Sequence, residues 1–128
     1  MSASPVTGVD FVSIPSTDLH RSSDFYAGIL GLHRSVWVPE RHFSEYETGN
    51  LTLSVINFAG MGLENVGAGA PIALHVDDVA ATRADLEAKG VVFHGDVLDT
   101  GVCHMAPFSD PDGNQLLLHH RYAPRETE

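Results

Sequence analysis

Cysteine is nearly absent from this chain, and long apolar runs are missing. The single cysteine, Cys103, has no internal partner for a disulfide, which favours a reducing compartment. No apolar run approaches the roughly 18 residues that a membrane-spanning helix requires. Residues 1–7 carry neither the basic region nor the apolar region of a secretory signal peptide. We therefore expect a cytoplasmic protein that does not insert into membranes.

Basic residues are also scarce. Seven Lys and Arg stand against seventeen Asp and Glu, which gives a formal net charge of −10. Nucleic acids and anionic membranes are bound through clustered Lys and Arg, so this balance argues against both as partners. The length of 128 residues and the hydrophobic content of 43% are ordinary for one globular domain.

An internal repeat organises the sequence. Residues 11–18 (FVSIPSTD) match residues 71–78 (PIALHVDD) at a constant offset of 60 residues. In both copies aliphatic residues alternate with other residues, which is typical of a strand with one buried face. Each strand ends at an aspartate suited to cap a helix, and the helical pattern that follows stops at Gly31 or Gly90. The repeat predicts a chain of two similar modules.

Three further strands are predicted after each helix. They cover about residues 33–38, 43–48 and 51–58 in the first copy, and about residues 92–93, 102–108 and 115–120 in the second. The last strand of each copy follows a turn, Gly49-Asn50 or Asp110-Pro-Asp-Gly-Asn114. We therefore predict a single α+β domain over residues 1–128. It contains two βαβββ modules, at about 8–60 and 71–122, joined by a glycine-rich linker at about 61–70.

These features resemble the vicinal-oxygen-chelate superfamily, which contains glyoxalases, bleomycin resistance proteins and extradiol dioxygenases. The resemblance rests on the strand at residues 11–19 with Phe25-Tyr26 and Leu30-Gly31-Leu32, on its counterpart at 71–79 with Leu86 and Lys89-Gly90-Val91, and on the turn at 108–114. It covers about residues 8–121. It implies eight strands in a U-shaped cup with the helices outside, and a homodimer whose modules pair within or between chains.

The resemblance also implies where a metal would lie. Enzymes of this superfamily hold a divalent metal through His, Gln or Glu side chains on four strands, and the metal polarises vicinal oxygens of the substrate. At those four positions this chain has Phe11, Ser54, Pro71 and Leu117. Three of these side chains have no donor atom, and a serine hydroxyl is a poor ligand at neutral pH. We expect no metal at the usual site and no cofactor.

The histidines leave two alternatives open. Strand alternation places His75 and His119 on the cup face, and His104 is a further candidate. With Glu45 or Glu47, these residues would form a displaced metal site. Without a metal, they would act as acid–base catalysts, because an unperturbed histidine pKa near ~6.5 suits proton transfer at neutral pH. A third interpretation is that they hydrogen-bond one another or a ligand.

Other reactive side chains have simpler explanations. Asp110 and Asp112 lie in a turn that explains their carboxylates by bonds to the backbone. Cys103 precedes His104, but a buried structural cysteine is expected more often than an activated thiol.

The preferred hypothesis is a metal-free protein that binds a small apolar or aromatic molecule in its cup, as drug-sequestering members of the resembled family do. The acidic balance favours a cationic ligand. The predicted lining consists of Phe11, Ser13, Trp37, Ser54, His75, Leu117 and His119. The alternative is a glyoxalase-like or dioxygenase-like enzyme that uses the displaced metal or the histidine chemistry.

Overall fold

The structure, a computed structural model, describes residues 5, 7, 9–62 and 71–124. Its elements, in chain order, are β1 (Phe11–Pro15), α1 (Leu19–Ser23), the π-helical segment η1 (Asp24–Ile29), β2 (His33–Val38), η2 (Pro39–Arg41), β3 (Phe43–Glu47), β4 (Thr52–Ile56), η3 (Ala59–Met61), β5 (Ile72–His75), α2 (Val79–Ala88), β6 (Leu98–Asp99), β7 (Cys103–Ser109) and β8 (Gln115–Arg121). Most of the predicted linker, residues 63–70, lies outside the described residues.

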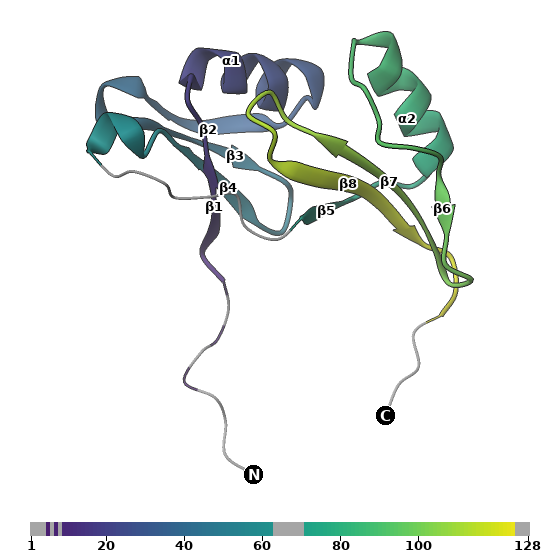
Figure 1. The fold of residues 1–128 in the computed structure, drawn as a ribbon. Coiled ribbons are helices and arrows are strands. Elements are labelled where there is room, and N and C mark those ends of the chain that lie inside the picture. Colours follow the sequence, from purple (N-terminus) through teal and green to yellow (C-terminus); the bar gives the residue numbers. More distant parts are fainter. Residues whose placement is uncertain (1–4, 6, 8, 63–70, 125–128) are drawn as a thin grey trace.

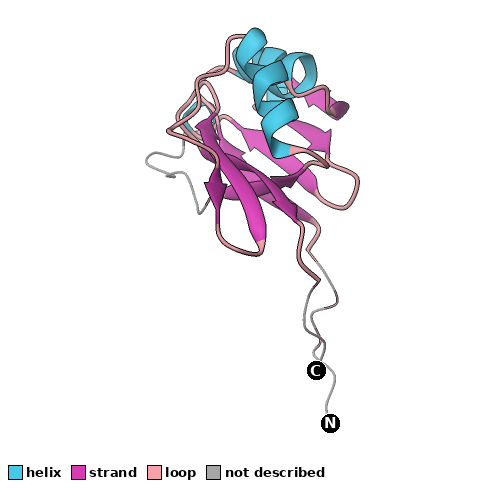
Figure 2. Ribbon diagram, turned by 90° about the vertical axis from the view of Figure 1, so that its right-hand side faces the viewer, coloured by secondary structure: helices cyan, strands magenta, loops and turns pink. Residues whose placement is uncertain are grey.

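Each half of the chain forms one four-stranded sheet. The strand orders are β1-β4-β3-β2 and β5-β8-β7-β6, so the second sheet repeats the topology of the first. In both sheets the first strand pairs with the last in parallel, and the remaining pairs are antiparallel. Figure 1 shows α1 and α2 on the same side of the two sheets, and Figure 2 shows the same layering after a quarter turn. The predicted α+β organisation in two modules is confirmed.

The helices begin and end where their terminal residues allow. Asp18 accepts a hydrogen bond from the Arg21 amide at 3.1 Å, and Asp78 accepts one from the Ala81 amide at 3.0 Å. These bonds satisfy amides of the first turn that have no partner inside the helix. Both predicted caps are therefore confirmed.

The sixth strand does not lie where the sequence pattern placed it. We predicted a strand at residues 92–93, but Phe93 makes only an isolated bridge to Phe108. The strand is β6, which pairs with β7. Val92 is 76% exposed and Phe93 is 8% exposed. A loop that anchors one aromatic side chain gives the same two-residue alternation as a strand, which is why the prediction was wrong.

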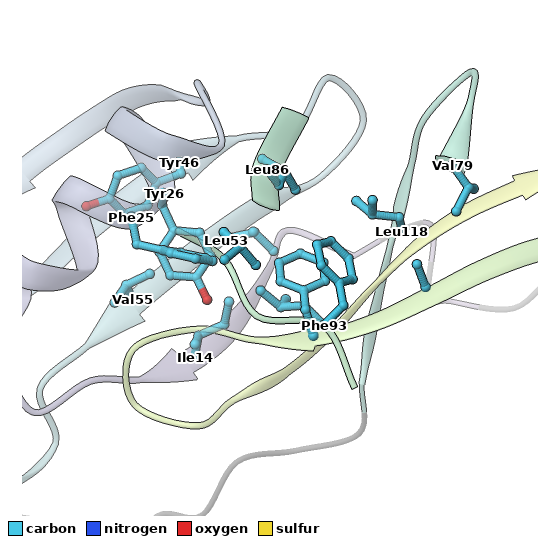
Figure 3. Close-up of a cluster of buried hydrophobic side chains, with 14 of the residues drawn as sticks. Ile14, Phe25, Tyr26, Tyr46, Leu53, Val55, Val79, Leu86, Phe93 and Leu118 are labelled. Atoms are coloured by element: carbon cyan, nitrogen blue, oxygen red, sulfur yellow. The ribbon is translucent and has the colours of Figure 1, made fainter. Parts of the chain in front are cut away.

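One hydrophobic core extends through both modules. Figure 3 shows side chains from the first module beside those from the second in a single cluster. The Phe25 ring of the first module lies 6.4 Å from the Phe108 ring of the second. The two modules therefore share apolar contacts and are not stable units placed side by side.

Two hydrogen bonds between the modules reinforce this shared core. The buried Tyr26 hydroxyl donates to Asp110 at 2.8 Å, and the Asn114 side chain donates to the Pro15 carbonyl at 2.8 Å. Burial and the neighbouring Asp110 carboxylate raise the pKa of Tyr26, so this hydroxyl remains a donor at neutral pH. Asp110 also accepts from the amides of Asp112 and Asn114, as its turn role predicted.

No helix among the described residues combines the length and the apolar character needed to cross a membrane.

Candidate functional site

Strand register divides each sheet into two faces, because residues opposite one another on neighbouring strands point the same way. One face packs against the helices. We call the other the helix-free face. From the registers it includes Phe11, Ser13, Pro15, Phe43, Glu45, Glu47, Thr52, Ser54 and Ile56 in the first sheet, and Ala73, His75, Met105, Pro107, Leu117 and His119 in the second.

The first sheet contributes an exposed aromatic side chain to this face. Phe11 is 51% exposed, whereas Ile14 of the same strand is buried in the core. Ser13 lies opposite Ser54, and Ser54 lies opposite Glu45. Ser54 is only 3% exposed, since it is enclosed by its neighbours in the sheet. The predicted residues Phe11, Ser13 and Ser54 therefore share one face.

The same half carries fixed negative charge. The Glu47 carboxylate accepts hydrogen bonds from the hydroxyls of Ser35 at 2.5 Å and Thr52 at 2.6 Å. The Ser35 bond, followed by the Thr52 bond, lowers the pKa of Glu47. Glu47 is therefore ionised at neutral pH, and Glu45 lies two residues earlier on the same strand and the same face.

The second sheet contributes apolar groups and one half-buried histidine. Leu117 lies opposite Ala73 and Pro107, while His119 lies opposite His75 and Met105. Met105 and Pro107 were missed from the sequence. The face on which β7 displays its odd-numbered residues is set by its pairing with β8, and the residue pattern of β7 alone does not reveal it.

His75 lies at the edge of this face. Its strand, β5, is the outermost strand of its sheet. The His75 ring lies 5.9 Å from the ring of His120, a residue of the helix-covered face, and its Nε2 is 3.6 Å from the exposed carboxylate of Asp77. His75 therefore lies at the rim and does not project over the middle of the sheet. His120 faces away from the helix-free face, as expected.

Two predicted site residues lie on the opposite face. Trp37 pairs with Ser44 on the helix side, where its ring packs edge-on against His20 at 5.1 Å and beneath Arg34 at 4.3 Å. His104 lies opposite His120, also on the helix side. The expectations that Trp37 lines the cup and that His104 points into it are corrected. The bulge in β2 between Arg34 and Val36 shifts the alternation that would have given the orientation of Trp37.

His104 belongs instead to a small polar cluster near the end of β7. Its Nε2 is 3.4 Å from an Asp99 carboxylate oxygen, and the Tyr122 hydroxyl donates to the other oxygen at 2.7 Å. The Tyr122 bond is the main cause that lowers the pKa of Asp99. Each member has a partner, so the cluster has a sufficient structural explanation.

The donor set does not fit the metal of the resembled enzymes. Phe11, Pro71 and Leu117 offer no ligand atom, and Ser54 offers one weak ligand that is buried in the sheet. Within residues 9–62 and 71–124, no three His, Cys, Asp or Glu side chains lie close enough together to hold a metal ion. The displaced site proposed from the histidines and Glu45 or Glu47 is not assembled here.

Comparison with known proteins agrees with this architecture. The family model of the Glyoxalase/Bleomycin resistance protein/Dioxygenase superfamily matches residues 8–118. The chain belongs to this superfamily. No curated protein sequence matches the chain significantly. The expected fold of the superfamily, with two βαβββ modules, is thereby confirmed.

Several solved structures of the superfamily are similar. TnmS3, an antibiotic binding protein from Streptomyces sp. CB03234, has 26% identity and a TM-score of 0.76 over 93% of this chain and 99% of its own. A glyoxalase/bleomycin resistance protein from the same organism has 27% identity and a TM-score of 0.65 over 84% of this chain and 96% of its own. Lactoylglutathione lyase from Agrobacterium tumefaciens has 18% identity and a TM-score of 0.76, covering 91% and 95%, and shares the fold alone.

Proposed function

We propose that this chain binds a small apolar or aromatic molecule over the helix-free face, without a metal. The observation that carries the proposal is Phe11, an aromatic side chain that is 51% exposed on the helix-free face of β1. Burying apolar surface is favourable by about 25 cal/mol per Å², so a ligand that covers the Phe11 ring gains this free energy on binding. Phe11 occupies a position where the superfamily's enzymes have a metal ligand. We propose that its ring contacts the bound molecule directly at this position, in place of a metal ion.

The charge of the face indicates the kind of ligand. Glu45 and Glu47 lie on the same face as Phe11 and Phe43, and hydrogen bonds keep Glu47 ionised. Carboxylates beside aromatic rings favour a planar cation, which gains attraction from the charges and from the ring faces. We therefore propose that a cationic aromatic molecule binds more tightly than a neutral or anionic one of the same shape.

The similar structures support binding over turnover. One similar structure, with 26% identity, is described as an antibiotic binding protein. At the four usual ligand positions, this chain also has three side chains without a ligand atom and one serine, which is a poor ligand. We propose that it acts in the cytoplasm as a homodimer, since exposed apolar residues such as Leu98 and Val102, away from Phe11, are commonly covered by a partner.

The proposal is tested by thermal unfolding with a panel of planar aromatic compounds in cationic, neutral and anionic forms. A ligand at 100 times its Kd raises the stability by about 2.7 kcal/mol, which gives a clear rise in Tm. We expect Phe11→Ala to lose this rise. The matched control is Val92→Ala, because Val92 is an exposed apolar residue far from this face in the sequence and outside the two sheets.

Two results would contradict the proposal. The first is the absence of any Tm rise across the panel for the unmodified chain. The second is stoichiometric metal in protein purified without a histidine tag, since a genuine metal site retains its ion during purification.

A further inference from the structure

The internal repeat gives the molecule two equivalent junctions between its modules. In the first junction, α1 and η1 are bonded to the turn that precedes β8. In the second, α2 and the turn that precedes β4, at residues 48–51, line the same cavity. The repeat offset of 60 residues makes Tyr26 equivalent to Leu86 and Phe25 equivalent to Asp85. The packing of the two junctions can therefore be compared residue by residue.

The first junction is filled. Tyr26 is fully buried and donates to Asp110 across the junction at 2.8 Å. Phe25 packs against Phe108 of the other module at 6.4 Å. Arg21 pairs with Asp112 at 3.1 Å, which adds a further bond between the modules. The aromatic side chains fill the first junction, and hydrogen bonds between the two modules hold it together.

The second junction is hollow. Leu86 is shorter than a tyrosine and has no polar atom with which to reach the facing turn. Asp85 pairs with Lys89 of its own helix at 3.4 Å. In the turn, the Thr48 hydroxyl donates to the Leu51 carbonyl at 2.7 Å. These polar groups are satisfied within their own elements, and a cavity of about 620 Å³ remains between them.

The wall of this cavity is aliphatic and its rim is polar. The wall includes Leu30, Leu51, Leu53, Ile72, Leu74 and Leu118, which come from both modules; Leu53, Leu118 and the neighbouring Leu86 are labelled in Figure 3. At the rim, Asn50 and Thr82 offer hydrogen bonds, and the charges of Asp85 and Lys89 balance each other. No Phe, Tyr or Trp lines it among the residues that the structure describes.

We propose that this cavity is a second binding site, for a small, neutral, mainly aliphatic or alicyclic molecule that carries a hydroxyl or carbonyl group. Its volume lies within the range of about 300–1,000 Å³ that is usual for small-molecule sites. In this proposal the ligand fills the space in the second junction that corresponds to the space filled by the side chains of Phe25 and Tyr26 in the first. Most of the cavity wall, including Leu53, Leu74 and Leu118, belongs to the helix-covered face. Ala73 and His75 of the edge strand β5 also line the cavity, so it meets the helix-free face only along this edge.

The test uses 1-adamantanol and ¹³C-methyl NMR spectra of the full chain. We expect saturable shifts of the Leu30, Leu51 and Leu74 methyl signals, with a Kd on the order of 1 mM or tighter. The methyl signals of Met105 and Leu117, on the helix-free face, should not move. These separate reporters distinguish this site from the proposed function, which concerns the other face.

Two variants of α2 complete the test. Thr82→Trp places a large side chain into the cavity from a half-buried lining position and should raise the Kd at least about tenfold. Ala84→Trp adds the same side chain at an exposed position of the same helix and should leave the Kd unchanged.

Three outcomes would overturn the inference. The first is the absence of any saturable shift at Leu30, Leu51 and Leu74. The second is a set of shifts confined to Met105 and Leu117, which would place the probe on the helix-free face alone. The third is self-association that Thr82→Trp abolishes while the chain binds no probe, which would assign the cavity to a second copy of the chain.

Discussion

Tyr26 connects the two modules through one hydroxyl group. It donates to the buried Asp110 carboxylate at 2.8 Å, and a hydrogen bond to a charged acceptor contributes about 1.5–3 kcal/mol. Tyr26→Phe keeps the ring and removes only this donor. We therefore expect the free energy of unfolding to fall by about 1.5–3 kcal/mol, measured by urea denaturation.

Tyr46→Phe is the matched control for this prediction. Tyr46 is equally buried, but its hydroxyl accepts from the neutral Ser44 hydroxyl at 3.0 Å, and no charge is involved. The expected loss is about 0.5–1.5 kcal/mol. If Tyr46→Phe destabilises as much as Tyr26→Phe, the bond to Asp110 has no special role.

Tyr122 and Asp99 form an exposed pair whose contribution depends on pH. The Tyr122 bond lowers the pKa of Asp99 in the folded state, so the bond stabilises the fold above the unfolded pKa of about 4. That stabilisation is lost as the pH falls through the folded pKa. We expect Tyr122→Phe to lower the Tm at pH 7 and to match the unmodified chain at about pH 2. A difference that persists unchanged into acid would contradict this.

Among the secondary structure elements, α2 depends on its first residue. Asp78 accepts from the Ala81 amide at 3.0 Å and caps the helix. We expect Asp78→Ala to cost about 0.5–2 kcal/mol in the free energy of unfolding and to speed hydrogen exchange in the first turn of α2. Asp77→Ala is the control, since Asp77 is adjacent, fully exposed and caps nothing. Equal effects of the two substitutions would mean that charge, and not capping, matters.

The elements that the sequence predicted well are those with two independent signals. Strand β1 and helix α1 combine alternation, a capping aspartate and a later glycine, and the 60-residue repeat duplicates these signals for β5 and α2. Strand β6 has no capping residue and lies outside the repeated segments at 11–18 and 71–78, and its two residues are both exposed. Short edge strands are defined by their partner strand, which the local sequence does not contain.

The candidate site was only partly predictable for the same reason. Strand alternation, counted from the repeated segments, predicts the orientation of Phe11, Ser54 and Leu117. The strand registers place all three on the helix-free face. Trp37 follows a bulge, and His104 lies on a strand whose orientation depends on β8. Alternation gives the period of a strand, but the side that it faces is set by long-range pairing.

The whole molecule is held together by contacts that cross between the modules. The core cluster draws on both halves, and Asp112 of the second module bonds the amide and hydroxyl of Thr17, together with Arg21. These contacts gather at the first junction, whereas the second junction contains a cavity. The modules are therefore coupled mainly through one side of the molecule, and loss of that side exposes apolar area in both.

This coupling predicts one cooperative unfolding transition. Trp37 is the only tryptophan and lies in module one, so its fluorescence reports that module, while hydrogen exchange in β8 reports module two. Because the core is shared, we expect both probes to give the same urea midpoint. Asp112→Ala should lower both midpoints together, as it removes bonds between the modules. If Trp37 fluorescence changes at a lower urea concentration than β8 exchange, the modules unfold separately and the shared core does not couple them.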